Sequence, residues 1–346
     1  MSRRRPALVT GGAGFIGSHL ADRLLAEGWE VRVLDDFSSG REDNLAESGH
    51  RVELFKGDVR DAELVGRAVD GAEVVFHQAA VPSVPRSIAE PLRTHDVNVN
   101  GTLNVLEQAR QAGVRRVVYA ASSSAYGNTP TLPKIETMPA TPMSPYALQK
   151  YVGEVYCRLY AELYGLETVA LRYFNIFGPR QNPDSEYAAV IPRFLRACLR
   201  AERPRIYGDG EQTRDFTFVA DAVSANVLAA DAPRASGHVM NVGGGGRTSL
   251  NALLAAVREL TSTTLEAIHE PARAGDVRDS LAALDRARDL IGYAPQVDLR
   301  EGAIRTEEDQ AHVYCYDKRL TRTGYGQRLL QGLPPFTLER RAVRGQ

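Results

Sequence analysis

The chain has 346 residues and a formal net charge of −1, so its charge predicts no binding to nucleic acid or to another polyanion. No stretch approaches the ~18 consecutive apolar residues of a membrane span, and the basic start Arg3–Arg5 lacks the apolar run of a signal peptide. The cysteines Cys157, Cys198 and Cys315 are too widely spaced to indicate a disulfide framework or a zinc site. We therefore expect a cytoplasmic protein without a metal centre or a membrane anchor.

The N-terminal stretch carries the signature of a dinucleotide-binding loop. A short apolar strand ends at Val9, an amphipathic helix is expected over Phe15–Ala26, and glycines fill the turn between them. These glycines let the chain turn sharply, leave room for a pyrophosphate and let the helix pack close to the strand, with helix N–H groups facing the phosphates. The cofactor contacts expected from this loop are Gly11, Gly14, Phe15, Ile16 and Gly17.

The second predicted strand, Glu30–Asp35, ends in an acidic residue that discriminates between two cofactors. Asp35 follows Gly17 by 18 residues, where a ribose-binding carboxylate belongs in such a unit. A carboxylate there accepts hydrogen bonds from the ribose hydroxyls and repels a 2′-phosphate, so we predict NAD rather than NADP. The polar turn that follows is expected to line the adenosine pocket with Asp36, Ser38, Ser39 and Gly40.

The next two predicted strands, Val52–Lys56 and Glu73–His77, are followed by small, acidic and amide residues that suit a cofactor lying across the strand ends. Asp61 is typical of the N-cap of a helix over Ala62–Val69. The cofactor contacts predicted in this part are Asp58, Val59, Gln78, Ala79 and Ala80.

Strands and helices alternate without interruption up to about residue 174, which predicts a doubly wound parallel α/β sheet of the Rossmann type. The later elements expected in this part are a Pro-rich loop 82–91, a helix 94–112, a strand 116–120, a helix 146–164 and a strand 167–173. After Asn175 the rhythm changes to a helix near 188–200, a strand near 204–207, a strand 215–219, a helix from 219, a strand 239–242 and a helix 249–260. We therefore predict an NAD-binding domain at 1–174, a smaller interleaved α/β substrate domain at 175–305 with part of 215–235 returning to the first, and an atypical tail at 306–346.

Tyr146 and Lys150 lie four residues apart at the start of a predicted helix, so their side chains share one face. A phenol with a pKa near 10 is a weak base at neutral pH, but a neighbouring ammonium and an oxidised nicotinamide favour the phenolate. We therefore predict a Tyr–Lys acid–base pair beside the cofactor. The alternative is an amphipathic helix with an incidental lysine.

These motifs resemble the extended short-chain dehydrogenases/reductases, and among them the NAD-dependent sugar epimerase/dehydratase family. Thr10–Gly17 matches the cofactor loop of that family, and Ser122, four residues before Tyr126, falls on its catalytic Ser or Thr. The resemblance implies a homodimer in which helices 94–112 and 146–164 pair with their copies in a four-helix bundle. The site residues it implies are Ser122, Tyr146 and Lys150 for catalysis, with Asn98 and Tyr173 at the cofactor.

Matches in the second half imply a nucleotide-sugar substrate. Asn175 falls on the family's residue for the sugar-linked phosphate, and Arg214 and Arg273 fall on its diphosphate arginines. Asp276 falls on its uridine-ribose acid. Two arginines suit bidentate pairing with a diphosphate, although each alone suits a surface ion pair equally well. The resemblance places the nucleobase near Val190, Ile191 and Tyr207, which are too generic to separate uridine from thymidine.

The residues after Ser122 indicate the reaction. Ser123 and Ser124 stand where dehydrating members of the family carry an Asp–Glu pair and decarboxylating members keep a Glu. Without a carboxylate for a second proton transfer, the chemistry stops at oxidation of the sugar C4. The resemblance therefore implies a 4-epimerase with a transient 4-keto sugar and a recycled NAD, closest to the UDP-glucose 4-epimerases.

The expected sugar pocket leaves the substrate open. Ser280 stands where part of the family has a large Tyr, which admits UDP-N-acetylglucosamine as well as UDP-glucose and UDP-galactose. Arg86 can instead meet the carboxylate of a hexuronate, as in a UDP-glucuronate 4-epimerase. A decarboxylase, a dehydratase, a 4-keto-reductase and a non-catalytic NAD-sensing scaffold protein also stay open. The sugar contacts predicted are Ser83, Arg86, Ser122, Ser123, Ser124, Tyr146 and Ser280.

Overall fold

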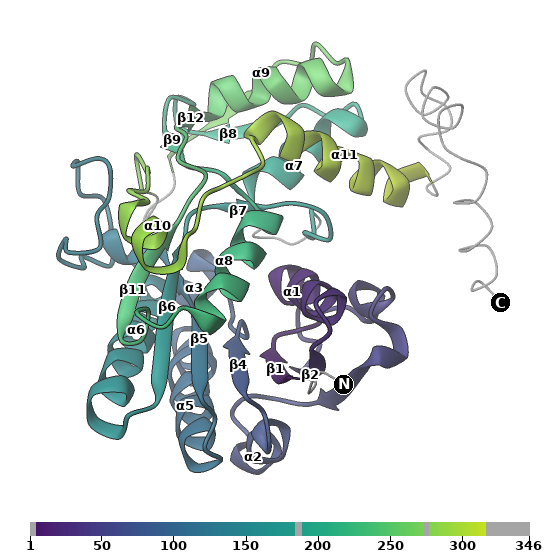
Figure 1. Cartoon of the computed structure of the whole chain (residues 1–346). Helices are drawn as coiled ribbons and strands as arrows, with labels where there is room; N and C mark the ends of the chain where they lie inside the picture. The colour runs from purple at the N-terminus through teal and green to yellow at the C-terminus, as the bar shows by residue number, and fades with distance from the viewer. Residues whose placement is uncertain (1–4, 184–188, 273–276, 316–346) are drawn as a thin grey trace.

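The computed structural model describes residues 5–183, 189–272 and 277–315, and a seven-stranded sheet lies at its centre (Figure 1). The strand order is β11-β6-β5-β4-β1-β2-β3, and every neighbouring pair is parallel. The predicted doubly wound α/β fold of the Rossmann type is therefore confirmed. The strands are β1 (Pro6–Thr10), β2 (Glu30–Asp35), β3 (Val52–Lys56), β4 (Val74–His77), β5 (Arg116–Ser122), β6 (Glu167–Tyr173) and β11 (His238–Val242).

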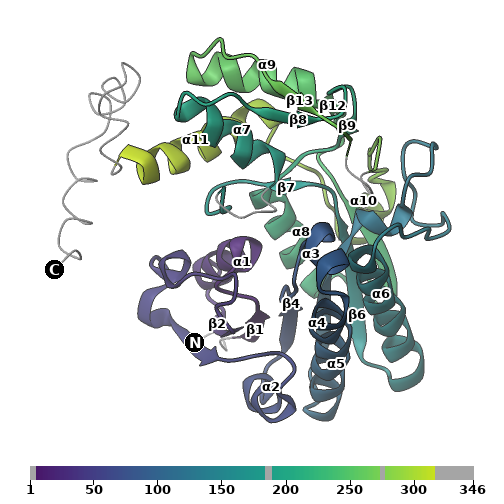
Figure 2. The same cartoon turned by 180° about the vertical axis from the view of Figure 1, so that it is seen from behind.

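Helices cover both faces of the sheet, because successive residues of a buried strand point to opposite sides. Helices α1 and α8 lie on one face and α2, α5 and α6 on the other (Figure 2). Val9 and Phe76 belong to the buried cluster of the first face, and Leu8 and Val75 to that of the second. The bounds are α1 (Phe15–Ala26), α8 (Val219–Asp231), α2 (Ala62–Val69), α5 (Gly101–Gln111) and α6 (Pro145–Tyr164).

Short-range signals set the ends of these helices. The Asp61 carboxylate accepts a hydrogen bond from Leu64 N at 3.0 Å, which confirms the predicted N-cap of α2. The Ser144 hydroxyl caps α6 through Ala147 N at 3.2 Å, and Gly165 ends that helix in the left-handed conformation. The start of α6, where Tyr146 and Lys150 lie, is therefore fixed by its own sequence.

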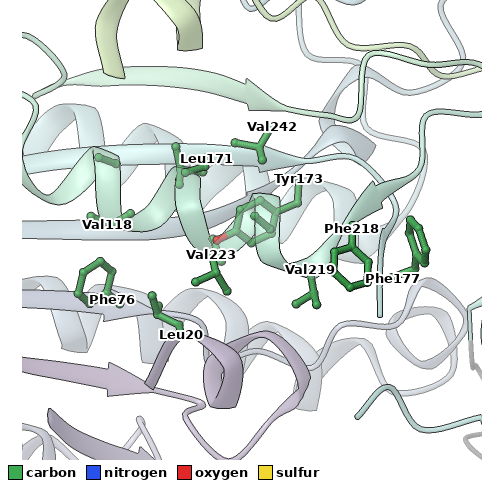
Figure 3. Packing of buried hydrophobic residues seen from close by; sticks show 14 of the residues in the cluster. Leu20, Phe76, Val118, Leu171, Tyr173, Phe177, Phe218, Val219, Val223 and Val242 are labelled. Atoms are coloured by element: carbon green, nitrogen blue, oxygen red, sulfur yellow. The ribbon is translucent and has the colours of Figure 1, made fainter. Parts of the chain in front are cut away.

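The two halves of the chain share the sheet. Strand β11 pairs with β6, and α8 packs against α1, so residues 219–242 complete the nucleotide-binding layer. Figure 3 shows this contact, with Leu20 of α1 and Val223 of α8 near Phe76 and Leu171 of the strands. The return to the first half thus extends beyond the expected residues 215–235, because β11 supplies the sheet's edge strand.

The second half forms a smaller lobe above the carboxyl ends of the strands, at the top of Figure 1. It contains three two-stranded pairs, β7–β10, β9–β12 and β8–β13, together with α7, α9 and α11, whereas α10 packs against β11 and α8 at the edge of the sheet. Their bounds are β7 (Ile176–Phe177), β10 (Thr217–Phe218), β9 (Thr213–Arg214), β12 (Thr248–Ser249), β8 (Arg205–Tyr207), β13 (Ile268–Glu270), α7 (Val190–Leu199), α9 (Leu250–Thr261), α10 (Asp285–Ile291) and α11 (Leu299–Cys315).

The predicted strand 215–219 is confirmed only at Thr217–Phe218, which forms β10, because Val219 starts α8 and Asp215 lies in the break between β9 and β10. The carboxylate of this fully buried residue accepts hydrogen bonds from Gly244 N at 2.8 Å and Ala282 N at 2.9 Å. These long-range bonds hold the break between the two strands, where the apolar pattern predicts an extended run. Burial raises the pKa of Asp215 to about 6.

The expected Pro-rich loop 82–91 instead contains a helix, α3 (Val84–Ala89), followed by α4 (Pro91–His95). Proline is compatible with the first turn of a helix, and the Ser83 hydroxyl caps α3 through Arg86 N at 3.1 Å. A π-helical turn at Asp96–Asn100 then leads into α5, so the helical run starts before the expected residue 94. The remaining short elements are 3₁₀ turns at Glu42–Leu45, Gly49–Arg51 and Ser123–Tyr126.

The tail expected at 306–346 does not begin as a separate segment, because α11 runs through its first residues to Cys315. Thr306, Glu307 and Gln310 are buried on this helix beside Ala303 and Ala311, so its inner face is mixed and gives only a weak amphipathic pattern. Residues 316–346 lie outside the described residues. Within the described ranges, no helix has both the length and the apolar composition needed to cross a membrane.

Candidate functional site

A cavity of about 850 Å³ lies across the carboxyl ends of the strands, at the place where doubly wound sheets bind ligands. Both halves of the chain contribute to its walls, from Gly11 after β1 to Ser280 between β13 and α10. Among the expected cofactor residues, those that line it are Gly11, Gly14, Phe15, Ile16, Gly17, Asp35, Asp36, Ser38, Ser39, Asp58, Val59, Gln78, Ala79, Ala80, Tyr146, Lys150 and Tyr173.

Two glycines of the first loop are required by their surroundings. Gly11 has a φ of +68°, and a Cβ there would lie 2.7 Å from Ala79 N. A Cβ on Gly17 would lie 2.1 Å from Gly11 O, because α1 starts against the turn. Gly14 has more room, with its nearest neighbour, Gly11 O, at 3.1 Å from such a Cβ. This glycine cradle therefore keeps its shape because a side chain at Gly11 or Gly17 would collide with neighbouring backbone.

Asp35 is held rigidly at the end of β2. Its carboxylate accepts hydrogen bonds from Ala13 N at 2.9 Å and Phe37 N at 2.8 Å, and burial raises its pKa. Gly40, expected to line the cavity, instead packs behind this carboxylate, where a Cβ would lie 2.7 Å from Asp35 Oδ1. Gly40 therefore supports Asp35 rather than lining the cavity.

Asn98, expected at the cofactor, does not line the cavity either. Its side chain is buried, accepts a hydrogen bond from Val81 N at 2.7 Å and donates one to Gln149 Oε1 at 2.8 Å. It joins the loop after β4 to α6. Asn98 lies in the π-helical turn Asp96–Asn100, which no spacing rule in the sequence predicts.

Tyr146, Lys150 and Ser122 meet at the cavity, as the motif spacing predicts. Burial raises the pKa of Tyr146 to about 12, and a hydrogen bond with Ser122 opposes the rise. Lys150 Nζ donates to Ala120 O at 2.8 Å, and burial lowers the pKa of this ammonium to about 8. The lysine is therefore anchored to β5, the strand that carries Ser122.

The serine turn after β5 is internally bonded. Ser124 Oγ donates to Ser122 Oγ at 2.8 Å, and Ser123 also lines the cavity. Sequence reasoning missed Ser87 of α3, whose Oγ accepts a hydrogen bond from Tyr146 N at 3.0 Å. Ser87 lies in the stretch 82–91, where the sequence predicts a loop. The contact between Ser87 and Tyr146 could have been anticipated only if a helix had been predicted there.

The lobe of the second half lines the other wall of the cavity with Asn175, Arg214 and Ser280, joined there by Ser83 and Arg86 from the start of α3. Asn175 Nδ2 donates to Asp215 O at 2.9 Å and to Ser280 Oγ at 3.3 Å. Asp215 therefore organises both residues, although neither its position nor its spacing marks it in the sequence. Lys134, Arg180 and Asp279 also line the cavity and were not predicted.

A second cavity of about 210 Å³ adjoins the first and is lined by the expected Val190, Ile191 and Tyr207. Arg214 lines both cavities, and its Nη1 donates to Thr213 O at 2.9 Å and Arg278 O at 3.1 Å. A guanidinium thus stands at the junction between a large and a small cavity. Arg273 and Asp276 lie outside the described residues.

The parallel sheet, the glycine cradle and the Tyr–Lys pair define a dinucleotide-dependent enzyme of the short-chain dehydrogenase/reductase type. The sequence profile described as "NAD dependent epimerase/dehydratase family" matches residues 7–243, and the chain belongs to this family.

Several epimerases are similar to this protein over most of its length. A UDP-glucose 4-epimerase of Mycolicibacterium smegmatis is 46% identical over 305 residues, which is 87% of this chain and 97% of the relative. The structure of a UDP-glucose 4-epimerase from Thermotoga maritima with UDP-glucose has a TM-score of 0.85 and 38% identity, and covers 89% of this chain and 99% of that one. A UDP-N-acetylglucosamine 4-epimerase from Methanobrevibacter ruminantium, in complex with UDP-N-acetylmuramic acid, has the same TM-score of 0.85 and 38% identity, covering 89% and 98%.

The cofactor of the family is NAD, and the walls of the main cavity fit it. Gly11 and Gly17 let the loop and the start of α1 pack tightly, and the loop lines the cavity at the helix N-terminus, which is where a pyrophosphate lies in this type of loop. The fixed carboxylate of Asp35 lies at the end of β2, where it suits unphosphorylated ribose hydroxyls.

Proposed function

We propose that this chain is an NAD-dependent UDP-hexose 4-epimerase, which interconverts UDP-glucose with UDP-galactose and UDP-N-acetylglucosamine with UDP-N-acetylgalactosamine. The observation that carries this proposal is the convergence of Ser122, Tyr146 and Lys150 on a cavity in which serines follow Ser122. No carboxylate stands at 123 or 124 to drive elimination or decarboxylation. The 4-keto sugar is then reduced again rather than transformed further.

The division of labour follows the two walls of the cavity. The sheet-side wall, from Gly11 to Tyr173, is proposed to hold NAD, and the wall formed by the second lobe is proposed to hold the nucleotide sugar. NAD, when bound, supplies an electron acceptor that is regenerated within each turnover.

Tyr146 is proposed as the acid–base group. Its phenol oxygen removes the proton of the sugar 4-hydroxyl and later returns one, while Ser122 Oγ shares that hydrogen bond. Burial alone opposes the phenolate, so the positive charge of Lys150 is needed to lower the pKa of Tyr146 in the loaded site. Lys150 is therefore proposed as the third catalytic residue, beside Ser122 and Tyr146.

The junction between the two cavities is proposed to hold the diphosphate. Arg214 is fixed there by two backbone carbonyls, and Asn175 lines both cavities beside it. The sugar then lies toward Tyr146, and the nucleobase occupies the small cavity near Val190, Ile191 and Tyr207. Arg273 and Asp276 remain proposed contacts on the resemblance alone.

The sugar pocket supports a broad substrate range. Ser280 is small and is bonded to Asn175 Nδ2, which leaves space in the wall for an acetamido group. A hexuronate is the second candidate, because Arg86 lines the cavity and its pairing with Glu90 is loose, at 3.7 Å.

We further propose a cytoplasmic homodimer. Helix α6 carries an outward apolar stripe that is not buried, formed by Leu148, Val152, Val155, Leu159 and Leu163. The stripe recurs every three to four residues, which suits pairing with a second copy in a four-helix bundle. Leu148→Glu should give monomers by light scattering coupled to size-exclusion chromatography. The matched change Leu228→Glu on α8 should not, and equal masses for both variants would reject this interface.

The function is tested by incubating the protein in turn with UDP-glucose, UDP-N-acetylglucosamine and UDP-glucuronate and separating the products. The expected result is the 4-epimer of at least one UDP-hexose with no net accumulation of NADH. Release of CO₂ or water, or an accumulation of NADH, would reject the epimerase. If all three substrates are returned unchanged while NAD is bound, a sensing protein is favoured.

A further inference from the structure

The catalytic lysine lies above a buried ion pair that the proposed reaction does not use. Glu154 and Arg172 have side chains only 2% and 5% exposed, on α6 and β6. Their contact is bidentate, with Arg172 Nε donating to Glu154 Oε1 at 2.9 Å and Nη2 donating to Oε2 at 2.7 Å. Such double bonding suits a charged carboxylate fixed in one orientation.

Glu154 lies one helical turn after Lys150, and both residues are on the buried face of α6. Residues four apart on a helix have Cβ atoms about 5–6 Å apart, and the charges at the ends of these two side chains are close enough to interact, with the Glu154 carboxylate raising the pKa of Lys150 against the effect of burial. Lys150 is only 4% exposed, which means that water screens this pair weakly.

The other titratable groups that face Lys150 are neutral at ordinary pH. They come from β4, β5 and α6: His77, whose pKa burial lowers to about 3, and Tyr119, Tyr146 and Cys157, whose pKa values burial raises. The Tyr119 ring lies 5.0 Å from Lys150 Nζ, and the ammonium donates its hydrogen bond to a neutral carbonyl, Ala120 O. Within the described part of the chain, Glu154 is therefore the anionic group among those that face this lysine.

Arg172 also connects this charge to the serine turn. It pairs with Ala121 in the register of β5 and β6, and its guanidinium lies 4.5 Å from the centroid of the Tyr126 ring. The Tyr126 hydroxyl in turn donates to Asn241 Oδ1 at 2.7 Å, on β11. Arg172 thus lies between the Glu154 carboxylate of α6 and Tyr126, the last residue of the turn that follows Ser122.

We propose that Glu154 is a positioning residue of the proposed epimerase: held by Arg172, its carboxylate is the buried counter-charge that keeps Lys150 protonated beside Tyr146. The inference rests on the proposed function for its catalytic consequence and on the contacts alone for its effect on Lys150. Without this charge, burial would drive the lysine to its neutral form, and Tyr146 would lose the ammonium that favours its phenolate.

The protonation of Lys150 can be measured directly, because the chain has only Lys56, Lys134, Lys150 and Lys318. Full-length protein with lysine labelled at the ε-carbon is titrated by NMR from about pH 6 to about pH 11, and Lys150→Arg identifies the signal. Glu154→Gln should lower the pKa of Lys150 by about one to two units, a tenfold to hundredfold change in its protonation constant. Glu154→Asp, which keeps the charge, should recover most of this shift.

Glu162→Gln is the matched control, since Glu162 is an exposed carboxylate on the same helix that pairs with Arg158. It should leave the pKa of Lys150 unchanged. Because Glu154→Gln leaves a guanidinium unpaired in the interior, the double variant Glu154→Gln/Arg172→Gln is measured as well. Its shift should have the same sign and a smaller size, since the more distant positive charge is also removed.

The catalytic readout is the alkaline limb of kcat/KM, which should move to lower pH by the same amount as the pKa of Lys150 in each variant. An unchanged pKa of Lys150 in the folded single and double variants would overturn the proposal. Since the titration needs no substrate, it stands apart from the sugar assay on the unaltered protein. Failure of that assay would reject the epimerase and leave the Glu154–Lys150 coupling intact.

Discussion

The two walls of the main cavity are built in different ways. The sheet-side wall consists mostly of backbone and of residues that directly follow or end successive strands, namely Gly11, Asp35, Ala79 and Ser122. The opposite wall brings together Arg86, Asn175, Arg214 and Ser280 from separate segments. The main chain of the buried Asp215 holds two of them, because its carbonyl accepts a hydrogen bond from Asn175 Nδ2 and its N–H donates one to Ser280 Oγ. The first wall is determined by local motifs and is suited to a constant ligand. The second depends on long-range contacts and is suited to a ligand that varies between relatives.

The largest effect is expected where the walls meet. Tyr146→Phe should reduce epimerisation by about 10³-fold or more while NAD stays bound, because the acid–base group is lost and the glycine cradle is untouched. The measurements are the rate of product formation and the NAD released on denaturation. Tyr151→Phe on the same helix is the control and should keep full activity. Retained activity in Tyr146→Phe would show that Tyr146 is not the acid–base group.

The next effect isolates the sheet-side wall. Gly17→Ala places a methyl group where Gly11 O lies only 2.1 Å away, so NAD affinity should fall by about 100-fold or more. Binding of UDP to the same protein, measured by calorimetry, should change little. Gly246→Ala is the control, since nothing lies within 4 Å of a Cβ at that position. Equal NAD affinities of the two variants would contradict the proposed role of the glycine cradle in binding NAD.

A smaller effect should isolate the other wall. Arg214→Gln should raise KM for the UDP-sugar about 10- to 100-fold with little change in kcat, because a diphosphate contact made in both ground and transition states is lost. Arg278→Gln, an exposed arginine paired with Asp209, serves as the control. Steady-state kinetics at saturating NAD provide the test. If kcat falls and KM is unchanged, Arg214 does not act in binding.

The smallest effect is purely structural. Asp61→Ala removes the side-chain cap of α2 and should lower the free energy of unfolding by about 1 kcal/mol, with no effect on the affinity of either wall for its ligand. Urea denaturation measures this change. Asp70→Ala, at the other end of the same helix, has no N-cap to lose and should be close to neutral.

The same contrast explains what the sequence could predict. The bounds of α1, β2, β3, α2 and β6 follow from short-range periodicity and caps, and the residues they place at the cavity were anticipated from motif spacing. Asp215, Ser87 and the true position of Asn98 depend on contacts between residues distant in sequence, or on a π-helical turn. Helix α3 was missed because its prolines suggest a loop, although proline is tolerated in a first helical turn.

The edge strand β11 has a consequence for how this protein is made. When residue 174 has emerged from the ribosome, the glycine cradle, Asp35 and the Tyr–Lys pair are already outside it. Helix α8 (219–231) and strand β11 (238–242) have not yet emerged. Until about seventy more residues emerge, β6 has an open edge and α1 lacks the helix that covers it. The cofactor-binding half should therefore gain protease resistance during synthesis only once the nascent chain extends past Val242, and a gene cut after residue 174 should yield an aggregating fragment rather than a small NAD-binding protein.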